Sequence, residues 1–302
     1  MRRLGYAGNG ILQVPVTRVP QVTAMKAVLK FILALIVVVV PVAAVHVGFS
    51  FLEIGKFAAH TLAALASIPA CWMAYYGYVR LVEKRAVTEL ATQGALAELG
   101  RGALIGVALF SSTIGVLAAL GMYRIRDMGT VSDLVGPLAQ ALAAAATEEI
   151  VFRGVFFRLS EASLGTPLAL LISATVFGLI HLLNGHATLQ GALCIIFEAG
   201  ILLAAAFMLT RRLWFPMGMH FAWNFTQGGI FGVAVSGGAT AGLFRGELSG
   251  PTWLSGGAFG VEGSVVALVL CASVGVGLLR MAWVRQGFVR PFWRRQLAPQ
   301  PV

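Results

Sequence analysis

The sequence predicts an all-α fold, namely a polytopic membrane helix bundle of about eight transmembrane helices. Hydrophobic residues make up 58% of the 302-residue chain and charged residues only 11%, whereas soluble domains are about 25% charged. The apolar runs are long, and about 20 apolar residues suffice for a spanning helix. A membrane β-barrel would instead show alternating segments of about ten residues. These observations exclude a soluble domain and favour helical spans.

The apolar runs divide the chain into four parts. We expect an N-terminal cytoplasmic segment (1–26), N-terminal transmembrane helices (27–136) with a charged interfacial helix at 80–101, a membrane core (137–235), and a final part (236–302) with a Gly- and Ser-rich loop, the last helix and a basic cytoplasmic tail. The expected spans are about residues 27–52, 57–79, 102–122, 134 to beyond 157, 167–183, 188–209, 214–235 and 262–283.

The charge distribution predicts the orientation. Lysine and arginine number 22 against 12 acidic residues, a formal charge of +10. The basic residues concentrate at both termini, in 80–101 and at Arg211–Arg212, which lie on one side of an eight-span bundle. The positive-inside rule then places both termini in the cytoplasm. We expect a bacterial inner membrane protein whose basic residues meet anionic lipid, not nucleic acid.

Ionisable residues inside membrane spans are costly, at least ~2.5 to 3.5 kcal/mol each, and so are candidates for function. The first group is EEIVFR, residues 148–153. Glu149 and Arg153 are four residues apart, the spacing of a helical ion pair. Glu148 points about 100° away and lacks this partner, which suits a general base. The structural alternative is a charged helix end that reaches the membrane surface.

Two further groups follow in the next spans. His181 ends the segment FGLIH (177–181), and HFAWN (220–224) places His220 and Asn224 on one helix face. Two converging hydrogen-bond donors can form an oxyanion site, although a core histidine or a packing hydrogen bond between helices would leave the same pattern. Together the groups supply what amide hydrolysis by an activated water requires. The serine hydrolase and zincin motifs G-x-S-x-G and H-E-x-x-H are absent.

In order and spacing, the patterns EExxxR, FxxxH and HxxxN resemble those of the CPBP family. These are the CAAX-processing and bacteriocin-processing (ABI) intramembrane proteases, and the chain is similar to their type II CAAX prenyl endopeptidases. The resemblance covers about residues 137–232, including RRLWFPMGMH (211–220). It implies an intramembrane endopeptidase whose catalytic core is the 137–235 segment, acting on a peptide or membrane-protein substrate.

The resemblance also implies a role for each motif residue. Glu148 and His181 would activate the attacking water, and His220 and Asn224 would hold the oxyanion. Glu149 and Arg153 would be a supporting ion pair.

A metal-free mechanism is favoured and no cofactor is expected, because Asn224 is a poor zinc ligand and a good oxyanion donor. Zinc is the alternative, with Glu148, His181 and His220 as a three-ligand set. Glu198, in the sixth expected span, either lines the cavity or bonds a neighbouring helix.

Two other functions remain open. A catalytically inactive scaffold or bacteriocin-immunity-type membrane protein would be expected to lack some motif residues. A proton-coupled transporter would also use intramembrane Glu and His, but usually shows paired repeats. The sequence indicates no particular oligomeric state.

Overall fold

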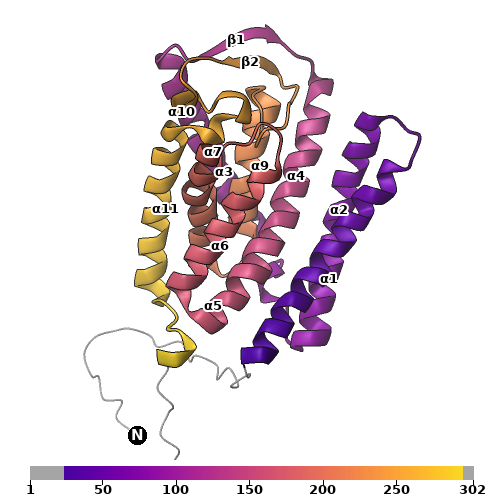
Figure 1. Ribbon diagram of the computed structural model, residues 1–302, viewed down its shortest axis with the longest axis vertical. Helices are drawn as coiled ribbons and strands as arrows, with labels where there is room; N and C mark the ends of the chain where they lie inside the picture. The colour runs from indigo at the N-terminus through magenta and orange to yellow at the C-terminus, as the bar shows by residue number, and fades with distance from the viewer. Residues whose placement is uncertain (1–23, 295–302) are drawn as a thin grey trace, which may run out of the picture.

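A computed structural model describes residues 24–294 as a bundle of long helices capped by a short β-ribbon (Figure 1). Seven helices in the described part are long and apolar enough to cross a membrane. They are Met25–Ser50, Lys56–Glu83, Ala95–Ala119, Val131–Leu164, Thr166–Leu183, Leu189–Thr210 and Val265–Gln286. These helices confirm the expected all-α, multi-pass integral membrane protein. The expected N-terminal segment lies almost wholly outside the described residues, as does the end of the basic tail.

The membrane-crossing helices are composed of α-helical segments, several of which continue directly into 3-10 or π-helical segments. The α-helices are α1 (Ala24–Ser50), α2 (Lys56–Tyr78), α3 (Ala95–Ala119), α4 (Val135–Glu149), α5 (Arg158–Leu164), α6 (Thr166–Ile180), α7 (Leu189–Ile195), α8 (Leu202–Thr210), α9 (Trp214–Asn224), α10 (Thr252–Ser255) and α11 (Val265–Gln286). The π-helical segments are η1 (Val79–Glu83), η4 (Ile150–Phe157), η6 (Ile196–Ile201) and η7 (Phe225–Ile230). The 3-10 turns are η2 (Thr88–Leu90), η3 (Val131–Leu134), η5 (His181–Leu183), η8 (Gly257–Phe259), η9 (Val261–Gly263) and η10 (Phe292–Arg294).

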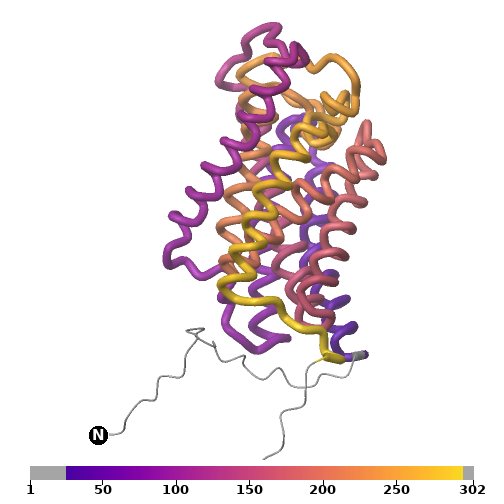
Figure 2. Tube along the Cα trace, turned by 90° about the vertical axis from the view of Figure 1, so that its left-hand side faces the viewer, coloured from indigo at the N-terminus to yellow at the C-terminus, as the bar shows by residue number. Residues whose placement is uncertain are grey.

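The segment expected as the seventh span is shorter than the other passes. It consists of α9 and η7, with 11 and 6 residues, and it packs against α3 and α4 inside the bundle. Eight of the eleven residues of α9 are buried, and no residue between 214 and 230 is exposed. With this pass included, α1 begins and α11 ends at the same end of the bundle (Figures 1 and 2).

Glycines let α3 and α9 approach closely. A Cβ atom at Gly102 would overlap the carbonyl oxygen of Phe215, and one at Gly106 would overlap that of Met219. On α9, a Cβ at Gly218 would overlap the carbonyl oxygen of Leu99 in return. Gly102 and Gly106 form a GxxxG pattern, which allows helix backbones to meet in membranes. This contact sets the depth of α9, the helix that carries His220 and Asn224.

The Gly- and Ser-rich segment expected as a loop contains a strand. Strand β2 (Phe244–Leu248) pairs antiparallel with β1 (Tyr123–Met128), and this ribbon lies across one end of the bundle (Figure 1). Arg124 stands opposite Glu247, and such cross-strand pairs of opposite charge stabilise a ribbon. Between Ile125 and Asp127 the register shifts. The ribbon ties the α3–α4 connection to the segment before α11.

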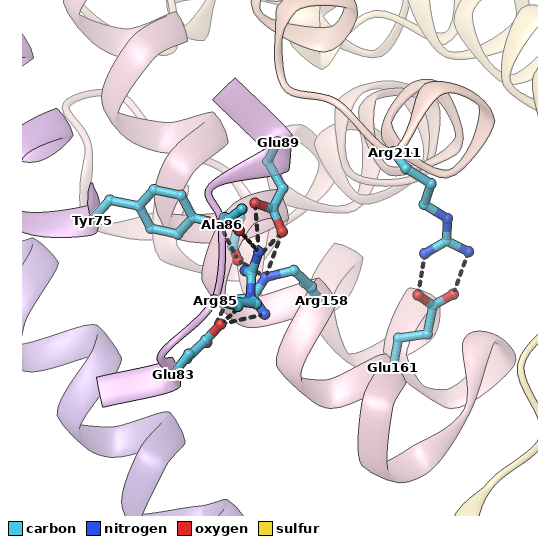
Figure 3. Close-up of polar contacts among 9 residues, drawn as sticks. Tyr75, Glu83, Arg85, Ala86, Glu89, Arg158, Glu161 and Arg211 are labelled. Carbon is cyan, nitrogen blue, oxygen red and sulfur yellow. Dashed lines mark hydrogen bonds and ion pairs between the residues drawn. The ribbon is translucent and has the colours of Figure 1, made fainter. Parts of the chain in front are cut away.

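Residues 80–101 do not form the expected interfacial helix. The backbone at Lys84 is left-handed, with φ of +55°, and ends the helix that began in α2. Charged side chains then pair with each other and with α5 (Figure 3). Arg85 contacts Glu83 at 2.5 Å and Glu89 at 2.8 Å, and Arg158 contacts Glu83 at 2.7 Å. The acidic residues fold inward onto arginines because two of them are almost enclosed by the protein and need counter-charges.

A second ion pair lies beside this cluster. Arg211, in a left-handed turn after α8, pairs with Glu161 of α5 (Figure 3). Arg211 also donates to Gln286 at the end of α11. These contacts join α5, α8 and α11 at the end of the bundle where α11 ends.

Candidate active site

The Glu149–Arg153 pair lies in the centre of the bundle. Arg153 Nη1 donates to Glu149 Oε1 over 2.8 Å, and the two side chains are 1% and 0% exposed. Arg153 Nη2 also donates to the carbonyl oxygen of Ala199 at 2.9 Å, which links η4 to η6. The ion pair predicted from the four-residue spacing is confirmed, and it also connects two helices.

His220 joins the same carboxylate from the opposite side. Its Nδ1 lies 2.9 Å from Glu149 Oε1, and its Nε2 lies 4.0 Å from Glu148 Oε2. Because Glu149 accepts from Arg153, the hydrogen on this contact is assigned to Nδ1 of His220. The ring is therefore held in one orientation, with Nε2 facing Glu148. The motif spacings did not predict this contact, because the two residues are 71 positions apart.

Glu148 is the accessible member of the acidic pair. Its side chain is 33% exposed, whereas that of Glu149 is fully buried. One of its oxygens, Oε2, is shielded from solvent and has no hydrogen-bond partner among the described residues. Two adjacent acids on one helix thus have different surroundings. Glu149 is fully buried and its Oε1 binds both Arg153 and His220, whereas Glu148 is partly exposed and has an unfilled acceptor beside His220. The Oε2 of Glu149 is also without a partner among the described residues.

His181 is oriented by its own helix. Its Nδ1 lies 2.7 Å from the carbonyl oxygen of Phe177, so the hydrogen is assigned to Nδ1 and Nε2 is left free. The ring of Phe177 lies beneath the Arg153 guanidinium, with Cζ 4.5 Å from the ring centroid. The FxxxH pattern therefore couples two groups of the site, since Phe177 contacts Arg153 with its ring and His181 with its carbonyl. Sequence reasoning assigned Phe177 no role.

One cavity brings the four predicted catalytic residues together. It has a volume of about 150 Å³, and Glu148, His181, His220 and Asn224 all line it. Asn224 also lines a second cavity of about 600 Å³, together with residues of α2 and α4. Ala144 and Val235 are shared by both cavities as well. The second cavity therefore borders the first along α4.

Two further acids line the first cavity. Glu198 in η6 and Glu262 in η9 are 2% and 5% exposed. Glu262 Oε2 accepts from the backbone N–H of Ser236 at 2.6 Å and from Nε2 of Gln227 at 3.0 Å. Burial raises the pKa of Glu262, although these hydrogen bonds act in the opposite direction. Sequence reasoning left the role of Glu198 open and missed Glu262, whose only signal is an acid at the start of an expected span.

Three of the helices that form the cavity contain π-helical turns at the site. Segment η4 begins directly after Glu149, η6 contains Glu198, and η7 begins directly after Asn224. Such turns insert an extra residue into the helical hydrogen-bond ladder and occur frequently at functional sites. Here η6 contains the cavity-lining Glu198, and η4 and η7 begin within two residues of the cavity-lining Glu148 and Asn224.

The sequence also suggested a set of three zinc ligands. Glu148, His181 and His220 line the same cavity, but no group of three or more His, Cys, Asp or Glu side chains between residues 24 and 294 is arranged to hold a metal ion. The described residues thus form no three-ligand metal site, although His220 Nε2 lies 4.0 Å from Glu148 Oε2.

The comparison with known families agrees with the motifs. Residues 130–226 match the family model of the type II CAAX prenyl endopeptidase Rce1-like proteins. This match confirms the resemblance to the CPBP family over about a third of the chain, and the matched residues include all seven residues of the three patterns. A match to this family implies intramembrane CAAX protease activity in general. No curated protein and no solved structure matches the chain significantly.

Proposed function

We propose that the protein is an intramembrane endopeptidase that hydrolyses a peptide bond with a water activated by Glu148. The observation that carries this proposal is the convergence of Glu148, His181, His220 and Asn224 on one cavity, inside the stretch that matches the protease family. The four residues come from three different helices: Glu148 from α4, His181 from η5 at the end of α6, and His220 and Asn224 from α9.

The gap between Glu148 and His220 suits a bound water. The 4.0 Å separation of Glu148 Oε2 and His220 Nε2 exceeds a hydrogen bond, and a water at its side can contact both atoms. Glu148 takes a proton from this water as the water oxygen attacks the carbonyl carbon of the scissile bond. The same proton then passes to the leaving amine, so that Glu148 ends each turnover as it began.

His181 assists the attack. Its Nδ1–H is held by the Phe177 carbonyl, so the neutral ring presents the lone pair of Nε2. That lone pair can accept a hydrogen bond from the attacking water and orient the water oxygen toward the carbonyl carbon.

His220 and Asn224 bind the oxyanion that forms on the carbonyl oxygen. A protonated His220 donates from both nitrogens, with Nδ1–H bound to Glu149 and Nε2–H available to the oxyanion. The Asn224 amide lies one helical turn further along α9 and lines the same cavity. Pre-oriented donors of this kind stabilise developing charge without reorganisation.

Glu149 and Arg153 act as positioning residues. Glu149 fixes the His220 ring, while Arg153 balances the Glu149 charge and anchors it to η6 through Ala199. Because Glu149 neutralises its charge, Arg153 acts through Glu149 and not on the oxyanion itself.

The proposal includes the setting of the reaction. The substrate is a peptide or a membrane protein, no cofactor is required, and both termini are cytoplasmic in a bacterial inner membrane. Basic residues near the end where α1 begins and α11 ends support this orientation, including Lys26, Lys84, Arg101 and Arg285. Anionic lipid headgroups would bind at that end.

A cleavage assay with matched variants tests the proposal. Membranes of a deletion strain complemented with wild type or Glu148→Gln are compared by quantitative proteomics. Precursors that accumulate in both the deletion and the Glu148→Gln strain identify the substrate, and purified protein is then tested for cleavage of that substrate.

The variants are compared in this cleavage assay. His220→Ala and Asn224→Ala should each lower turnover on the order of 10²- to 10³-fold. Glu247→Gln, at an exposed ribbon position, is the control that retains activity. If correctly folded Glu148→Gln cleaves at the wild-type rate, the proposed mechanism is wrong.

A further inference from the structure

Glu198 is a buried acid that the proposed reaction does not use. Its side chain lines the catalytic cavity, is 2% exposed, and has an oxygen, Oε2, with no hydrogen-bond partner among the described residues. A carboxyl group enclosed in this way is costly unless it carries a proton or meets a cation. Position 198 lies in a π-helical turn that faces the cavity, so a ligand in the cavity can reach the carboxyl group.

The cavity is rich in acids, and its basic side chains are the two histidines already assigned to the reaction, His181 and His220. Glu148, Glu198 and Glu262 line it, whereas no lysine or arginine does. Arg153, a buried cation in η4, is already bound to Glu149 and to the carbonyl oxygens of Ala199 and Gly200. A cationic ligand therefore complements the charge of this cavity, and an anionic one does not.

Glu262 completes the acidic part of the cavity from the other side. It interacts electrostatically with Glu198 and with His181. Its oxygens already accept from the backbone N–H and hydroxyl of Ser236 and from Gln227. These bonds fix Ser236 in a left-handed conformation, with φ of +46°. Glu262 thus holds the cavity wall in place, and Glu198 keeps an acceptor free for a ligand.

We propose that Glu198, backed by Glu262, forms a subsite that binds a lysine or arginine side chain of the peptide being cleaved. The inference rests on the proposed protease function and adds a substrate class to it. The remaining wall suits such a side chain, because Ile195, Leu202 and Cys271 line the same cavity and can pack against its aliphatic stem. A metal ion fits less well, since no third acidic, His or Cys side chain among the described residues joins the two acids in a metal-binding group.

Substrate preference measures this subsite directly. Purified protein in detergent is given a library of N-acetylated synthetic peptides, based on the substrate found by proteomics, in which each position around the scissile bond is Lys, Arg, norleucine or Gln. Acetylation removes the terminal amine as a competing cation. We expect kcat/KM for the basic peptide to exceed that for the norleucine peptide at one position by about 30-fold or more, mainly through KM. Glu198→Gln should bring this ratio close to one, Glu198→Asp should keep part of it, and Glu247→Gln should leave it unchanged.

A second measurement does not depend on folding of the variant. Cleavage-resistant analogues of the best peptide, with Lys or norleucine at the preferred position, compete with substrate on the wild-type protein. The lysine analogue should inhibit at a concentration at least about tenfold lower. Equal inhibition by both analogues, or an unchanged preference in folded Glu198→Gln, overturns the basic subsite while the protease function stands. Absence of any Glu148-dependent cleavage by the wild type would instead reject the protease function.

Discussion

Nδ1 of His220 lies 2.9 Å from Oε1 of Glu149, the same oxygen that accepts from Arg153 at 2.8 Å. One carboxylate oxygen thus joins the EExxxR and HxxxN motifs. Removal of this carboxylate affects both the ion pair with Arg153 and the orientation of His220. Suitable variants can therefore separate its effect on stability from its effect on turnover.

Glu149→Gln should lower both stability and activity. It leaves the Arg153 guanidinium without a counter-charge in a site that is 1% exposed, and breaking a buried pair costs ~3 to 5 kcal/mol. A detergent thermal-shift assay and a cleavage assay measure the two effects. The double variant Glu149→Leu with Arg153→Met replaces both charges by apolar groups, and should recover stability but not turnover. Recovery of turnover in the double variant would show that His220 needs no anchor.

Glu148→Gln should show that the two acids of the motif have different roles. Glu148 is 33% exposed, and its contact with His220 Nε2 is long, at 4.0 Å, so its replacement should leave the melting temperature near that of the wild type. Turnover should fall roughly 10²- to 10⁴-fold, because the general base is lost. The same pair of assays applies, and equal destabilisation by Glu148→Gln and Glu149→Gln would contradict the division of roles.

Chelation should leave the activity unchanged. In the proposed reaction Glu148 activates the water without a metal, so purified protein treated with a strong chelator and then desalted should cleave at its original rate. The control is metal analysis of the same sample by mass spectrometry. Activity that disappears on chelation and returns with zinc would assign His181 and His220 as ligands in place of the roles proposed here.

Gly106→Ala should reduce turnover without altering any cavity side chain. The added Cβ overlaps the carbonyl oxygen of Met219, so α9 must shift away from α3 and carry His220 and Asn224 with it. Catalytic geometry is sensitive to such a shift, and ~1 Å of displacement can cost about 10²-fold in rate. Gly115→Ala is the matched control on the same helix, since a Cβ there has no atom within 4 Å. Equal turnover of the two variants would show that α9 is not positioned by this contact.

Reporter fusions should reveal the orientation of the bundle. Fusions after residue 90 and at the C-terminus should report the cytoplasm, because the basic residues concentrate at that end. Fusions after residues 55 and 250 should report the opposite side. A cytoplasmic signal from the fusion after residue 250 would contradict the eight-pass arrangement, in which α9 and η7 form a crossing of their own.

Within a single helix the sequence was a sound guide. The spacing of Glu149 and Arg153 predicted their ion pair, which is confirmed at 2.8 Å. The apolar runs predicted the helical spans, although Glu262 proved to precede the last helix. The charged segment 80–101 was wrongly expected to be a helix, because its inward ion pairs to Arg158 depend on a residue far along the chain.

The sequence by itself determined that the chain is a membrane helix bundle and which side chains share one face of one helix. Both follow from local physics, since apolar length decides spanning and the 3.6-residue repeat decides the face. Only the tertiary structure decided that Glu149 anchors His220, that Phe177 supports Arg153, and that Glu198 and Glu262 line the same cavity. These contacts depend on how deeply and at what rotation the helices pack, which glycines such as Gly102 and Gly106 set through close backbone approach.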